Sequence, residues 1–538
     1  MSRLIRRSLS IIVLLALLLA ASAIAAPPSL AKEPTDTTVQ GINVDETTIP
    51  QLQRLMNGDR LTSVQLTRFY LNRIKRLNPV LHAVITVSPT ALADARAADR
   101  ARNRGDDRPL LGIPIIVKDN INTTGMPTTA GSWALAGSSP RDAFIVKRLR
   151  AAGAIIIGKA NLSEWANFRS IPSSSGWSGI GGQTNMAYVL DRNPCGSSSG
   201  SGVVASADLA VAAVGTETDG SIVCPSGANA VVGIKPTLGL LSRAGIIPIS
   251  ADQDTSGPMT RNVTDAAVLL GAMTGVDPND PATAAQRGNA FRDYTQFLDK
   301  NALRGARIGV WREGTDTFDG VPVDPEVDAI MQDVIDELEG QGATVSEVEL
   351  PIDVTYGPEF EALLCEFKTD IRTYLRTYTG PGYPKNLRAL IRFNRAHPDL
   401  EGPWNSQIFV DAQKTGGRSD PACKAARADA TPVVQGMLAD LLKDFDAIVA
   451  PTNGPAWLTD PVGGDLSDGS PFIGSSSASA ISGWADITVP AGYVDGALPI
   501  GVTFIGGRWD EPDLIGFAFD FEEATQVRVP PQYLPTLQ

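Results

Sequence analysis

Residues 112–119 have the sequence Gly112-Ile-Pro-Ile-Ile-Val-Lys118-Asp119, an apolar run that ends in two charged residues. A second apolar run, Ala154–Ile157, follows a segment with helical periodicity, Phe144–Ala152. Short continuous runs of β-branched residues on either side of a helix are typical of buried parallel strands. The chain from Ile113 to Ile157 therefore predicts a strand–helix–strand unit and an α/β fold class.

The same alternation occurs again farther along the chain. Arg307–Trp311 and Thr344–Val348 are strand-like and flank the helix-like Val327–Glu339. Further strands are expected at Ala447–Ala450 and Ile500–Ile505, and a helix at Thr62–Leu77 with Thr62 as its N-cap. The pattern indicates one α/β body.

Residues 352–440 differ from the rest of the chain by their aromatic content. The aromatic residues are Tyr356, Phe360, Phe367, Tyr374, Tyr378, Tyr383, Phe393, Trp404 and Phe409. Such a stretch can line a substrate pocket, but packed helices use aromatic side chains just as readily. We treat 352–440 as a variable insert, and both interpretations stay open.

Composition and charge exclude several classes of protein. The 538-residue chain has 46 basic and 59 acidic residues, so its formal net charge is −13 at pH 7. Hydrophobic residues make up 43% and charged residues 20%, which is typical of a globular protein and not of a disordered one. An acidic chain argues against binding to nucleic acids or anionic membranes. The two histidines, His82 and His397, leave few candidates for a metal ligand or an imidazole base.

The N-terminus has the parts of a secretory signal peptide. Arg3, Arg6 and Arg7 precede the uncharged stretch Ser8–Ala31, and Ala23-Ile24-Ala25 is an A-x-A cleavage motif. We expect residues 1–25 to be removed, with cleavage as late as residue 31 as an alternative, and the mature protein to be secreted or periplasmic. An uncleaved membrane anchor is the competing interpretation, because the uncharged stretch could span a bilayer. The polar residues 32–46 are expected to form a loose linker.

Four cysteines remain after the signal peptide: Cys195, Cys224, Cys365 and Cys423. Disulfides can form in an exported protein. Cys365 with Cys423 is one candidate pair, but four cysteines allow three connectivities, and the sequence does not choose between them. None of the four belongs to a CxxC motif or to a cluster of the metal-binding kind.

The Gly/Ser-rich loop Cys195-Gly-Ser-Ser-Ser-Gly-Ser-Gly202 allows three interpretations. It lacks the Gly-Lys-Ser/Thr ending of a phosphate-binding P-loop. It matches the G-x-S-x-G pattern of a nucleophile elbow, but a polar run stands where that motif needs a strand, and only His397 follows as a base. A flexible surface linker is the third interpretation.

A second Gly-rich turn, Gly215–Ile222, follows the apolar run Leu209–Val214. A turn of this kind can project a serine while backbone N–H groups converge on one point, as in an oxyanion hole, although a plain turn explains it as well. Because histidine is scarce, the remaining base for a serine is a lysine with a lowered pKa. Lys118 ends an apolar run and is the best candidate, since burial favours the neutral amine. Lys159 looks similar locally, and an ion pair of Lys118 with Asp119 is the structural alternative.

Taken together and in order, these segments resemble the amidase signature family. The three main motifs are Gly112–Asp119, Gly196–Ser201 and Thr216–Ile222, and further similar segments are Gly158–Asn161, Gly233–Thr237, Asp254–Pro258, Asp265–Ala267, Pro490–Gly492 and Leu498–Val502. The resemblance covers roughly residues 45–525. It implies a single large domain, placed at 47–525, with a mixed central β-sheet covered by helices on both faces. Residues 526–538 then form a C-terminal tail.

The resemblance also implies a Ser–cis-Ser–Lys triad. Carried over by position, Lys118 is the base, Ser197 the bridging serine in a cis peptide, and Ser221 the nucleophile. Backbone N–H groups of Thr218, Asp219, Gly220 and Ser221 would hold the oxyanion. Lys159 then has a structural role, and Ser198 is expected to support Lys118 by a hydrogen bond. The implied reaction requires no metal and no organic cofactor.

Three features depart from the common family pattern: Asp219 replaces a glycine, Val223-Cys224 replaces an arginine-containing segment, and Cys195 replaces a glycine. These features are similar to the peptide amidase branch, which removes the C-terminal amide of peptides. We therefore expect an exported, stand-alone serine amidohydrolase for peptide amides or small amides, without nucleic-acid partners. An aryl or fatty acyl amidase or esterase is the first alternative. A non-catalytic secreted binding protein is the second.

Overall fold

The computed structural model describes residues 35–312, 317–318, 321–322, 324–465 and 474–537. The expected signal peptide, residues 1–25, lies outside the described residues. The strands are β1 (Thr38–Val39), β2 (Ile42–Asn43), β3 (Val84–Val87), β4 (Pro114–Lys118), β5 (Ile155–Ala160), β6 (Trp177–Ser178), β7 (Gly182–Gln183), β8 (Ala212–Glu217), β9 (Val232–Lys235), β10 (Thr255–Thr260), β11 (Arg307–Trp311), β12 (Thr317–Phe318), β13 (Val321–Pro322), β14 (Thr344–Val348), β15 (Ala447–Pro451), β16 (Asp486–Val494) and β17 (Leu498–Ile505). The α-helices are α1 (Ile49–Asn57), α2 (Ser63–Leu81), α3 (Ala91–Arg102), α4 (Phe144–Ala151), α5 (Ser199–Ser206), α6 (Val223–Gly227), α7 (Val263–Met273), α8 (Pro325–Gly340), α9 (Tyr356–Tyr378), α10 (Leu387–Ala396), α11 (Gln407–Lys414), α12 (Pro421–Leu441), α13 (Ser476–Ser482) and α14 (Glu511–Thr525).

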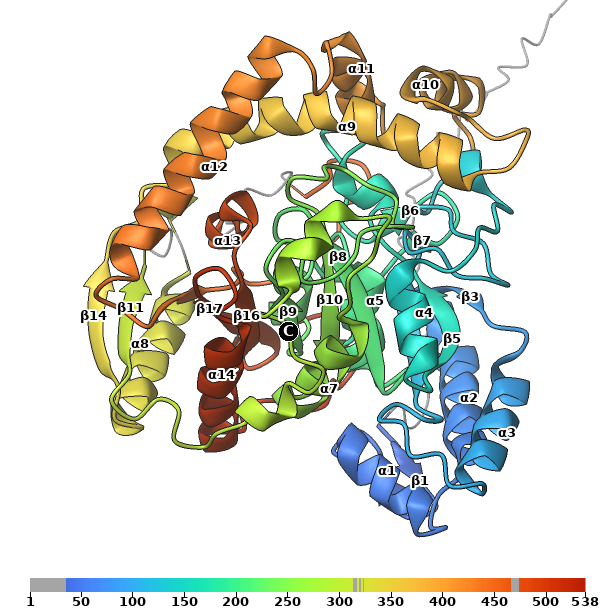
Figure 1. Ribbon diagram of the computed structural model, residues 1–538, viewed down its shortest axis with the longest axis vertical. Coiled ribbons are helices and arrows are strands. Elements are labelled where there is room, and N and C mark those ends of the chain that lie inside the picture. Colours follow the sequence, from blue (N-terminus) through green and yellow to red (C-terminus); the bar gives the residue numbers. More distant parts are fainter. Residues whose placement is uncertain (1–34, 313–316, 319–320, 323, 466–473, 538) are drawn as a thin grey trace, which may run out of the picture.

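An 11-stranded mixed sheet forms the centre of the molecule. Its strand order is β14-β11-β15-β17-β16-β9-β10-β8-β4-β5-β3. In Figure 1 it runs from β14 on the left to β3 on the right, with helices flanking it. The expected α/β fold with a central mixed sheet and flanking helices is confirmed.

The strand–helix–strand units predicted from the sequence are present. β4 and β5 pair in parallel and are joined through α4, and β11 and β14 pair in parallel and are joined through α8. Every residue of β4 is buried, which explains its unbroken apolar sequence. Thr62 caps α2 as expected, and a capping box with Gln65 reinforces it.

The pairing of β8 with β4 and the packing of α5 on both strands bring the Gly-rich segments together. β8 pairs with β4 in parallel and with β10 in an antiparallel register. β4 and β8 therefore end at the same edge of the sheet, and the Lys118 side chain and the turn after Glu217 emerge there. α5 packs against both strands and brings the Gly/Ser-rich loop to the same edge.

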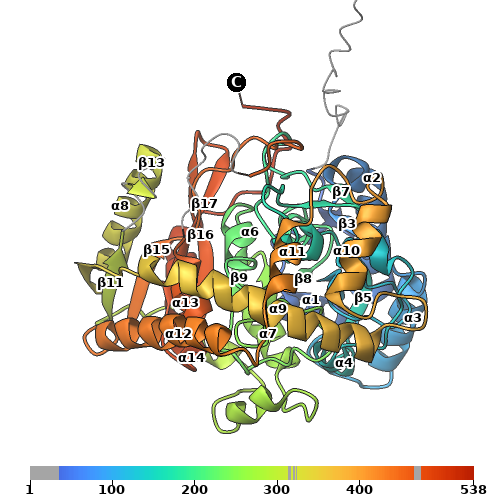
Figure 2. The ribbon, with the colours of Figure 1, turned by 90° about the horizontal axis from the view of Figure 1, so that it is seen from above.

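Residues 352–440 form the helices α9 to α12. In Figures 1 and 2, α9 extends from near β11 to near α10, and α12 lies beside it. The Cys365–Cys423 disulfide joins α9 to α12. Six of the nine aromatic side chains belong to one hydrophobic cluster, in which Phe367 stacks on Phe409 with ring centroids 5.4 Å apart. Of the nine aromatic residues, Phe360 lines the pocket described below, so each interpretation of this segment is correct in part.

Both ends of the described chain are folded onto the domain. β1 and β2 form an antiparallel pair, and the following Asp45 is 3% exposed. Arg528 binds both carboxylate oxygens of Asp45, at 2.9 and 3.0 Å. Leu534 donates its backbone N–H to the Tyr188 carbonyl. Residues 38–45 therefore do not form the loose linker that was expected, because a buried ion pair ties them to the C-terminal tail.

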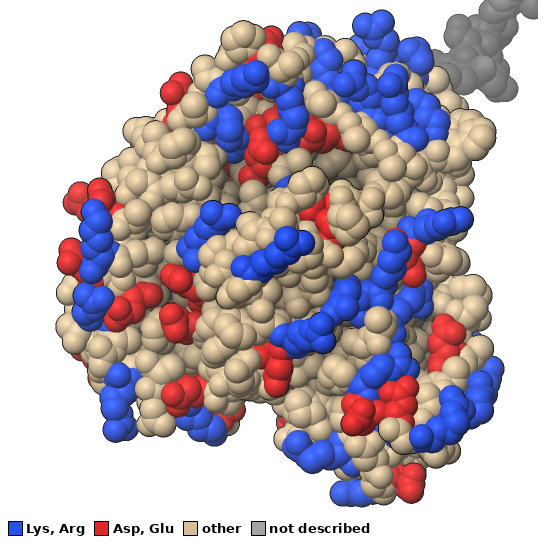
Figure 3. Space-filling view, in the orientation of Figure 1, with Lys and Arg blue, Asp and Glu red and all other residues tan. Residues whose placement is uncertain are grey.

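On the face shown in Figure 3, acidic and basic side chains are interspersed, and basic side chains gather where α10 lies in Figure 1. In the described part of the chain, no helix is both long and apolar enough to cross a membrane.

The contact between β9 and β10 depends on a glycine. A Cβ atom added at Gly257 would lie 1.8 Å from the backbone carbonyl oxygen of Ile234. Because a backbone atom cannot rotate away, we expect Gly257→Ala to lower the free energy of unfolding by ~1–3 kcal/mol, measured as a lower Tm. Gly436→Ala is the matched control, because Gly436 lies inside α12 with open space at this position. A Tm of Gly257→Ala equal to that of the wild type would contradict the prediction.

Candidate active site

Three side chains that the sequence analysis singled out form a chain of contacts. Lys118 Nζ at the end of β4 lies 2.8 Å from Ser197 Oγ, and Ser197 Oγ lies 2.9 Å from Ser221 Oγ. Lys118 and Ser197 are fully buried, and Ser221 is 7% exposed. A basic nitrogen is thus connected through one hydroxyl to a second hydroxyl that reaches a cavity.

Burial sets the protonation of Lys118. Desolvation is the main cause that lowers its pKa to about 7, and the negative charges of Glu217 and Asp254 oppose this only in part. Its ammonium or amine also contacts the Thr216 carbonyl oxygen at 3.2 Å. A large fraction of Lys118 is therefore neutral at neutral pH and can accept a proton.

The two locally similar lysines have different partners. Lys159 Nζ lies 3.0 Å from Asp119 Oδ1, and both side chains are fully buried. It also donates to Thr128 Oγ1 and to the Pro127 carbonyl. Asp119 thus pairs with Lys159, and the structural alternative considered for Lys118 does not apply. Lys159 contacts neither Ser197 nor Ser221.

The Gly/Ser-rich loop has an ordered, buried geometry, and the surface-linker interpretation is wrong. The Gly196–Ser197 peptide bond is cis. Ser198 donates to the Thr216 carbonyl at 3.0 Å and accepts the Thr216 N–H at 3.2 Å. The expected support of Lys118 by Ser198 is indirect: Ser198 holds the Thr216 carbonyl that Lys118 also contacts.

The turn after β8 lines the cavity with residues 218–221. Within the described residues, the N–H groups of Thr218, Asp219, Gly220 and Ser221 donate to no protein acceptor. The next two N–H groups, of Ile222 and Val223, are taken up by the Glu217 carboxylate. The four remaining donors are available to a negatively charged oxygen beside Ser221.

Asp219 turns its carboxylate toward α13. Its two oxygens accept hydrogen bonds from Ser476 Oγ at 2.6 Å and from Ser477 Oγ at 2.7 Å. Burial raises the pKa of Asp219, and these two hydroxyls oppose the rise. The carboxylate of Asp219, which replaces the glycine of the common family pattern, is thus held by α13. The Asp219 N–H remains available to a negatively charged oxygen beside Ser221.

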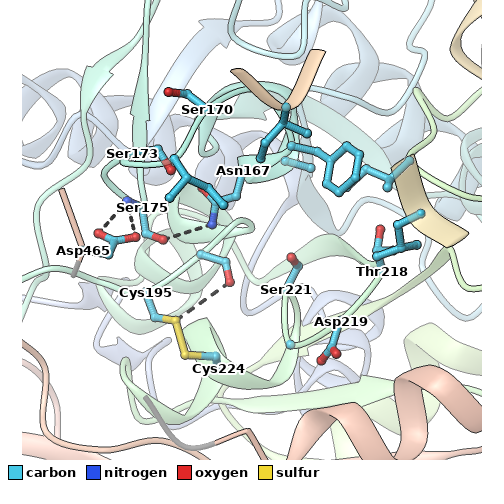
Figure 4. A pocket seen from close by; sticks show the side chains of 18 of the residues that line it. Asn167, Ser170, Ser173, Ser175, Cys195, Thr218, Asp219, Ser221, Cys224 and Asp465 are labelled. Atoms are coloured by element: carbon cyan, nitrogen blue, oxygen red, sulfur yellow. Dashed lines mark hydrogen bonds between the residues drawn. A yellow bond between two sulfur atoms is a disulfide. The ribbon is translucent and has the colours of Figure 1, made fainter. Parts of the chain in front are cut away.

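A cavity of about 360 Å³ opens above Ser221. It is lined by Ala166, Asn167, Phe168, Ser170, Ile171, Pro172, Ser173, Ser175, Cys195, Gly196, Thr218, Asp219, Gly220, Ser221, Cys224, Ile249, Phe360, Leu363, Ile408, Trp457 and Asp465. In Figure 4, Ser221, Asp219 and Thr218 lie on one side of the view and Asp465 on the other. The described lining contains two carboxylates and no basic side chain, and most of its wall is apolar.

Neither histidine takes part in this site. His82 follows the end of α2, and His397 follows α10 and contacts the Phe393 carbonyl at 2.9 Å. Neither belongs to the described lining of the cavity. The nucleophile-elbow interpretation, which required His397 as its base, is therefore wrong.

Several residues that shape the site were not singled out from the sequence as having these roles. Thr216 bridges Lys118 and Ser198, and its side chain accepts a hydrogen bond from Asn120 at 2.8 Å. Asp254 accepts from Thr218 Oγ1 at 2.6 Å. Asn120 and Asp254 lie within or next to motifs that had been noted, whereas Ser476 and Ser477 lie in a segment without any recognisable signal.

One of the two disulfides lies at the site. Cys195 pairs with Cys224, and both residues line the cavity, while Cys365 pairs with Cys423 away from it. Among the described residues, no three His, Cys, Asp or Glu side chains are grouped so that they could hold a metal ion.

Known proteins share this sequence and architecture. The family model described as Amidase matches residues 65–515. A probable amidase of Arabidopsis thaliana is 40% identical over 508 residues, which cover 91% of this chain and 92% of that protein. The native peptide amidase from Stenotrophomonas maltophilia is 46% identical, with a TM-score of 0.85, and the match covers 91% of this chain and 99% of that one. A peptide amidase in complex with the competitive inhibitor chymostatin matches with 46% identity, the same coverage and a TM-score of 0.86. The chain therefore belongs to the amidase signature family and is a hydrolase that acts on amides.

Proposed function

We propose that this protein is an exported serine amidohydrolase that removes the C-terminal amide of peptides through Ser221, Ser197 and Lys118. The observation that carries the proposal is the pair of contacts of 2.8 and 2.9 Å that connects a buried lysine to the Ser221 hydroxyl at the cavity. Such a chain can supply the proton transfer that imidazole supplies in other serine hydrolases.

In the first half of the reaction, Ser221 Oγ attacks the amide carbonyl carbon. Its proton passes to Ser197 Oγ while the Ser197 proton passes to neutral Lys118. The N–H groups of residues 218–221 stabilise the negative oxygen of the tetrahedral intermediate. When the C–N bond breaks, the proton returns through Ser197 to the departing nitrogen, which leaves as ammonia or an amine. Ser221 then carries an acyl ester.

In the second half, water attacks the ester carbonyl. Its proton follows the same path to Lys118, and the same N–H groups stabilise the second tetrahedral intermediate. The ester C–O bond breaks, Ser221 recovers its proton, and the carboxylic acid leaves. Ser197 is unchanged at the end of each half because it gains one proton for every proton that it passes on.

Two observations support a peptide amide as the substrate. The chain is 46% identical to a peptide amidase over nearly its whole described length, and the cavity is large enough for a small peptide end. Its apolar wall, which includes Phe168, Phe360 and Leu363, also suits an aryl or fatty acyl group. We therefore retain an aryl or fatty acyl amidase as the second candidate.

Release of the amine product distinguishes the two candidates: ammonia from the two primary amides and aniline from the anilide. Purified protein, expressed without residues 1–25, is incubated with a dipeptide amide, an acyl anilide and a long-chain fatty acid amide of matched concentration. We expect kcat/KM for the dipeptide amide to exceed the other two by at least tenfold. A reversed order would favour the second candidate, and release from none of the three by a folded protein would contradict amide hydrolysis at this site.

Export rests on the N-terminal sequence, and the disulfides are consistent with it. Two disulfides are present in the described residues, and disulfides persist mainly outside the cytosol. Mass spectrometry of protein from the growth medium or periplasm is expected to show an N-terminus between residues 26 and 32. Full-length protein in the membrane fraction would instead support the uncleaved anchor.

The pH dependence of the reaction follows from the protonation of Lys118. Only the neutral amine accepts a proton, and burial lowers its pKa to about 7. We expect kcat/KM to rise about tenfold per pH unit below pH 7 and to level off above it. A profile measured between pH 5 and 9 checks this. Activity that is flat from pH 5 to 9 would contradict a lysine base.

A further inference from the structure

A disulfide connects the two segments that carry the serines. Cys195 lies two residues before Ser197, and Cys224 lies three residues after Ser221. Their sulfur atoms are bonded, and their Cα atoms are 6.0 Å apart. Both cysteines line the cavity and are 4% exposed. Figure 4 shows the disulfide near Ser221 on the side that faces Asp465.

Each half of this disulfide is held in place by its own segment. The Cys195 N–H donates to Asn193 Oδ1 at 2.9 Å, and its carbonyl accepts from Ser199 Oγ at 2.5 Å. The Cys224 N–H donates to the Gly220 carbonyl at 2.9 Å. The covalent bond therefore joins two locally ordered segments, and a displacement of one segment is passed to the other.

Other hydrogen bonds between the two segments involve Ser198 and Asn229 rather than Ser197. Ser198 exchanges two hydrogen bonds with the Thr216 backbone and donates its N–H to the Ser221 carbonyl at 3.2 Å, and Asn229 Nδ2 donates to the Pro194 carbonyl at 2.9 Å. At Ser197 itself, the link to the turn is the contact with the Ser221 hydroxyl, which the reaction uses. Proton transfer depends steeply on this contact, since a shift of ~1 Å can cost about 100-fold in rate.

We propose that the Cys195–Cys224 disulfide is a positioning element of the amidase reaction, which holds the Ser197 loop at hydrogen-bond distance from the Ser221 turn. The proposal rests on the proposed function of Ser221 and Ser197. It assigns to this disulfide an effect on turnover rather than on substrate binding alone. Loss of the bond lets the two segments separate while the sheet behind them keeps its fold.

The second disulfide is a matched control within the same chain. Cys365–Cys423 joins α9 to α12, and neither residue belongs to the described lining of the cavity. Both pairs are buried to a similar degree, with exposures of 3% and 4% for Cys365 and Cys423. Removal of Cys365–Cys423 is therefore expected to lower stability without changing the distance between the two serines.

The experiment compares two double variants, Cys195→Ala with Cys224→Ala and Cys365→Ala with Cys423→Ala. Values of kcat and KM for the dipeptide amide are measured at 25 °C, and folding is checked by circular dichroism and Tm. We expect kcat to fall at least 30-fold in the first variant, with KM changed less than threefold, and to stay within twofold of the wild type in the second. Equal kcat losses in both variants, or a loss confined to KM in the first, would overturn the proposal.

Reduction of the disulfide tests the proposal without a folding step. A phosphine transfers two electrons to the sulfur–sulfur bond and becomes the phosphine oxide, and water supplies the oxygen of the oxide and the protons of the two thiols. The enzyme that lacks Cys365 and Cys423 carries only the disulfide of interest. We expect its kcat to fall in step with alkylation of Cys195 and Cys224 in samples withdrawn over time. Full kcat in protein with both thiols alkylated would contradict the proposal.

Ser221→Ala separates this proposal from the function on which it rests. If Ser221→Ala retains turnover, the proposed function fails. If Ser221→Ala is inactive while the folded Cys195→Ala, Cys224→Ala variant keeps its kcat, only the positioning role of the disulfide fails.

Discussion

Ser221→Ala is expected to lower kcat on the order of 10⁶-fold, because removal of a serine nucleophile costs about that much. The variant loses the oxygen that forms the acyl ester, while the N–H groups beside it remain in place. The serine Oγ is a small group that is 7% exposed at the cavity, so we expect the Tm to stay close to that of the wild type. Ammonia release under single-turnover conditions measures the effect.

Ser201→Ala is the matched control for this loss. Ser201 lies in the same Gly/Ser-rich segment, but its hydroxyl donates to the Val214 carbonyl and it does not line the cavity. Its kcat is expected to remain within a few-fold of the wild type. Mass spectrometry of the wild type with a slowly released acyl substrate should place the adduct on Ser221. An adduct on another serine, or turnover by Ser221→Ala, would refute the assignment of the nucleophile.

Lys118→Met is expected to lower kcat by about 10³–10⁴-fold, which is the upper range for the loss of a general base. Methionine retains the apolar stem of the buried side chain but has no group that takes up a proton. The rise of kcat/KM through pH 7 should disappear with it. Turnover and Tm are measured together, and we expect the Tm to change little because Lys118 has no carboxylate partner at ion-pair distance in the described residues.

Lys159→Met gives the opposite pattern and serves as the control. Lys159 is as buried as Lys118, but it forms an ion pair with Asp119 at 3.0 Å. Removing one member of a buried ion pair leaves a charge without compensation and costs about 3–5 kcal/mol of stability. The expected signature is a lower Tm with kcat largely retained in the folded protein. If Lys118→Met instead lost Tm and kept kcat, Lys118 would have a structural role only.

The strand–helix–strand units could be predicted because their signal is local. Ile113–Val117 and Ile308–Trp311 are apolar because both of their sheet faces are covered, and this burial is visible in consecutive residues of the sequence. The order of the strands in the sheet has no comparable signal in consecutive residues. β9 lies near the centre of the sheet between β10 and β16, and its antiparallel partner β16 is far away in the chain.

The residues of the site could be predicted from their positions in the family motifs. The hydrogen bonds and ion pairs between them could be predicted only in part. Whether Asp119 pairs with Lys118 or with Lys159 depends on which side chain reaches it across two neighbouring strands. The orientation of Asp219 depends on Ser476, which lies 257 residues away. Such contacts depend on how distant parts of the chain pack together, so no pattern in consecutive residues predicts them.

The α/β class and many of the helix and strand segments follow from periodicity and from the burial of consecutive apolar residues. The assignment of Lys118, Ser197 and Ser221 comes instead from the resemblance of their segments to the amidase signature motifs. The disulfide pairs, the partners of Lys118 and Lys159 and the composition of the cavity wall became known from the folded chain. The physical reason is that each of these depends on which atoms meet at about 3–6 Å, and that is set by how the strands and helices pack and not by the residues next to them in the chain.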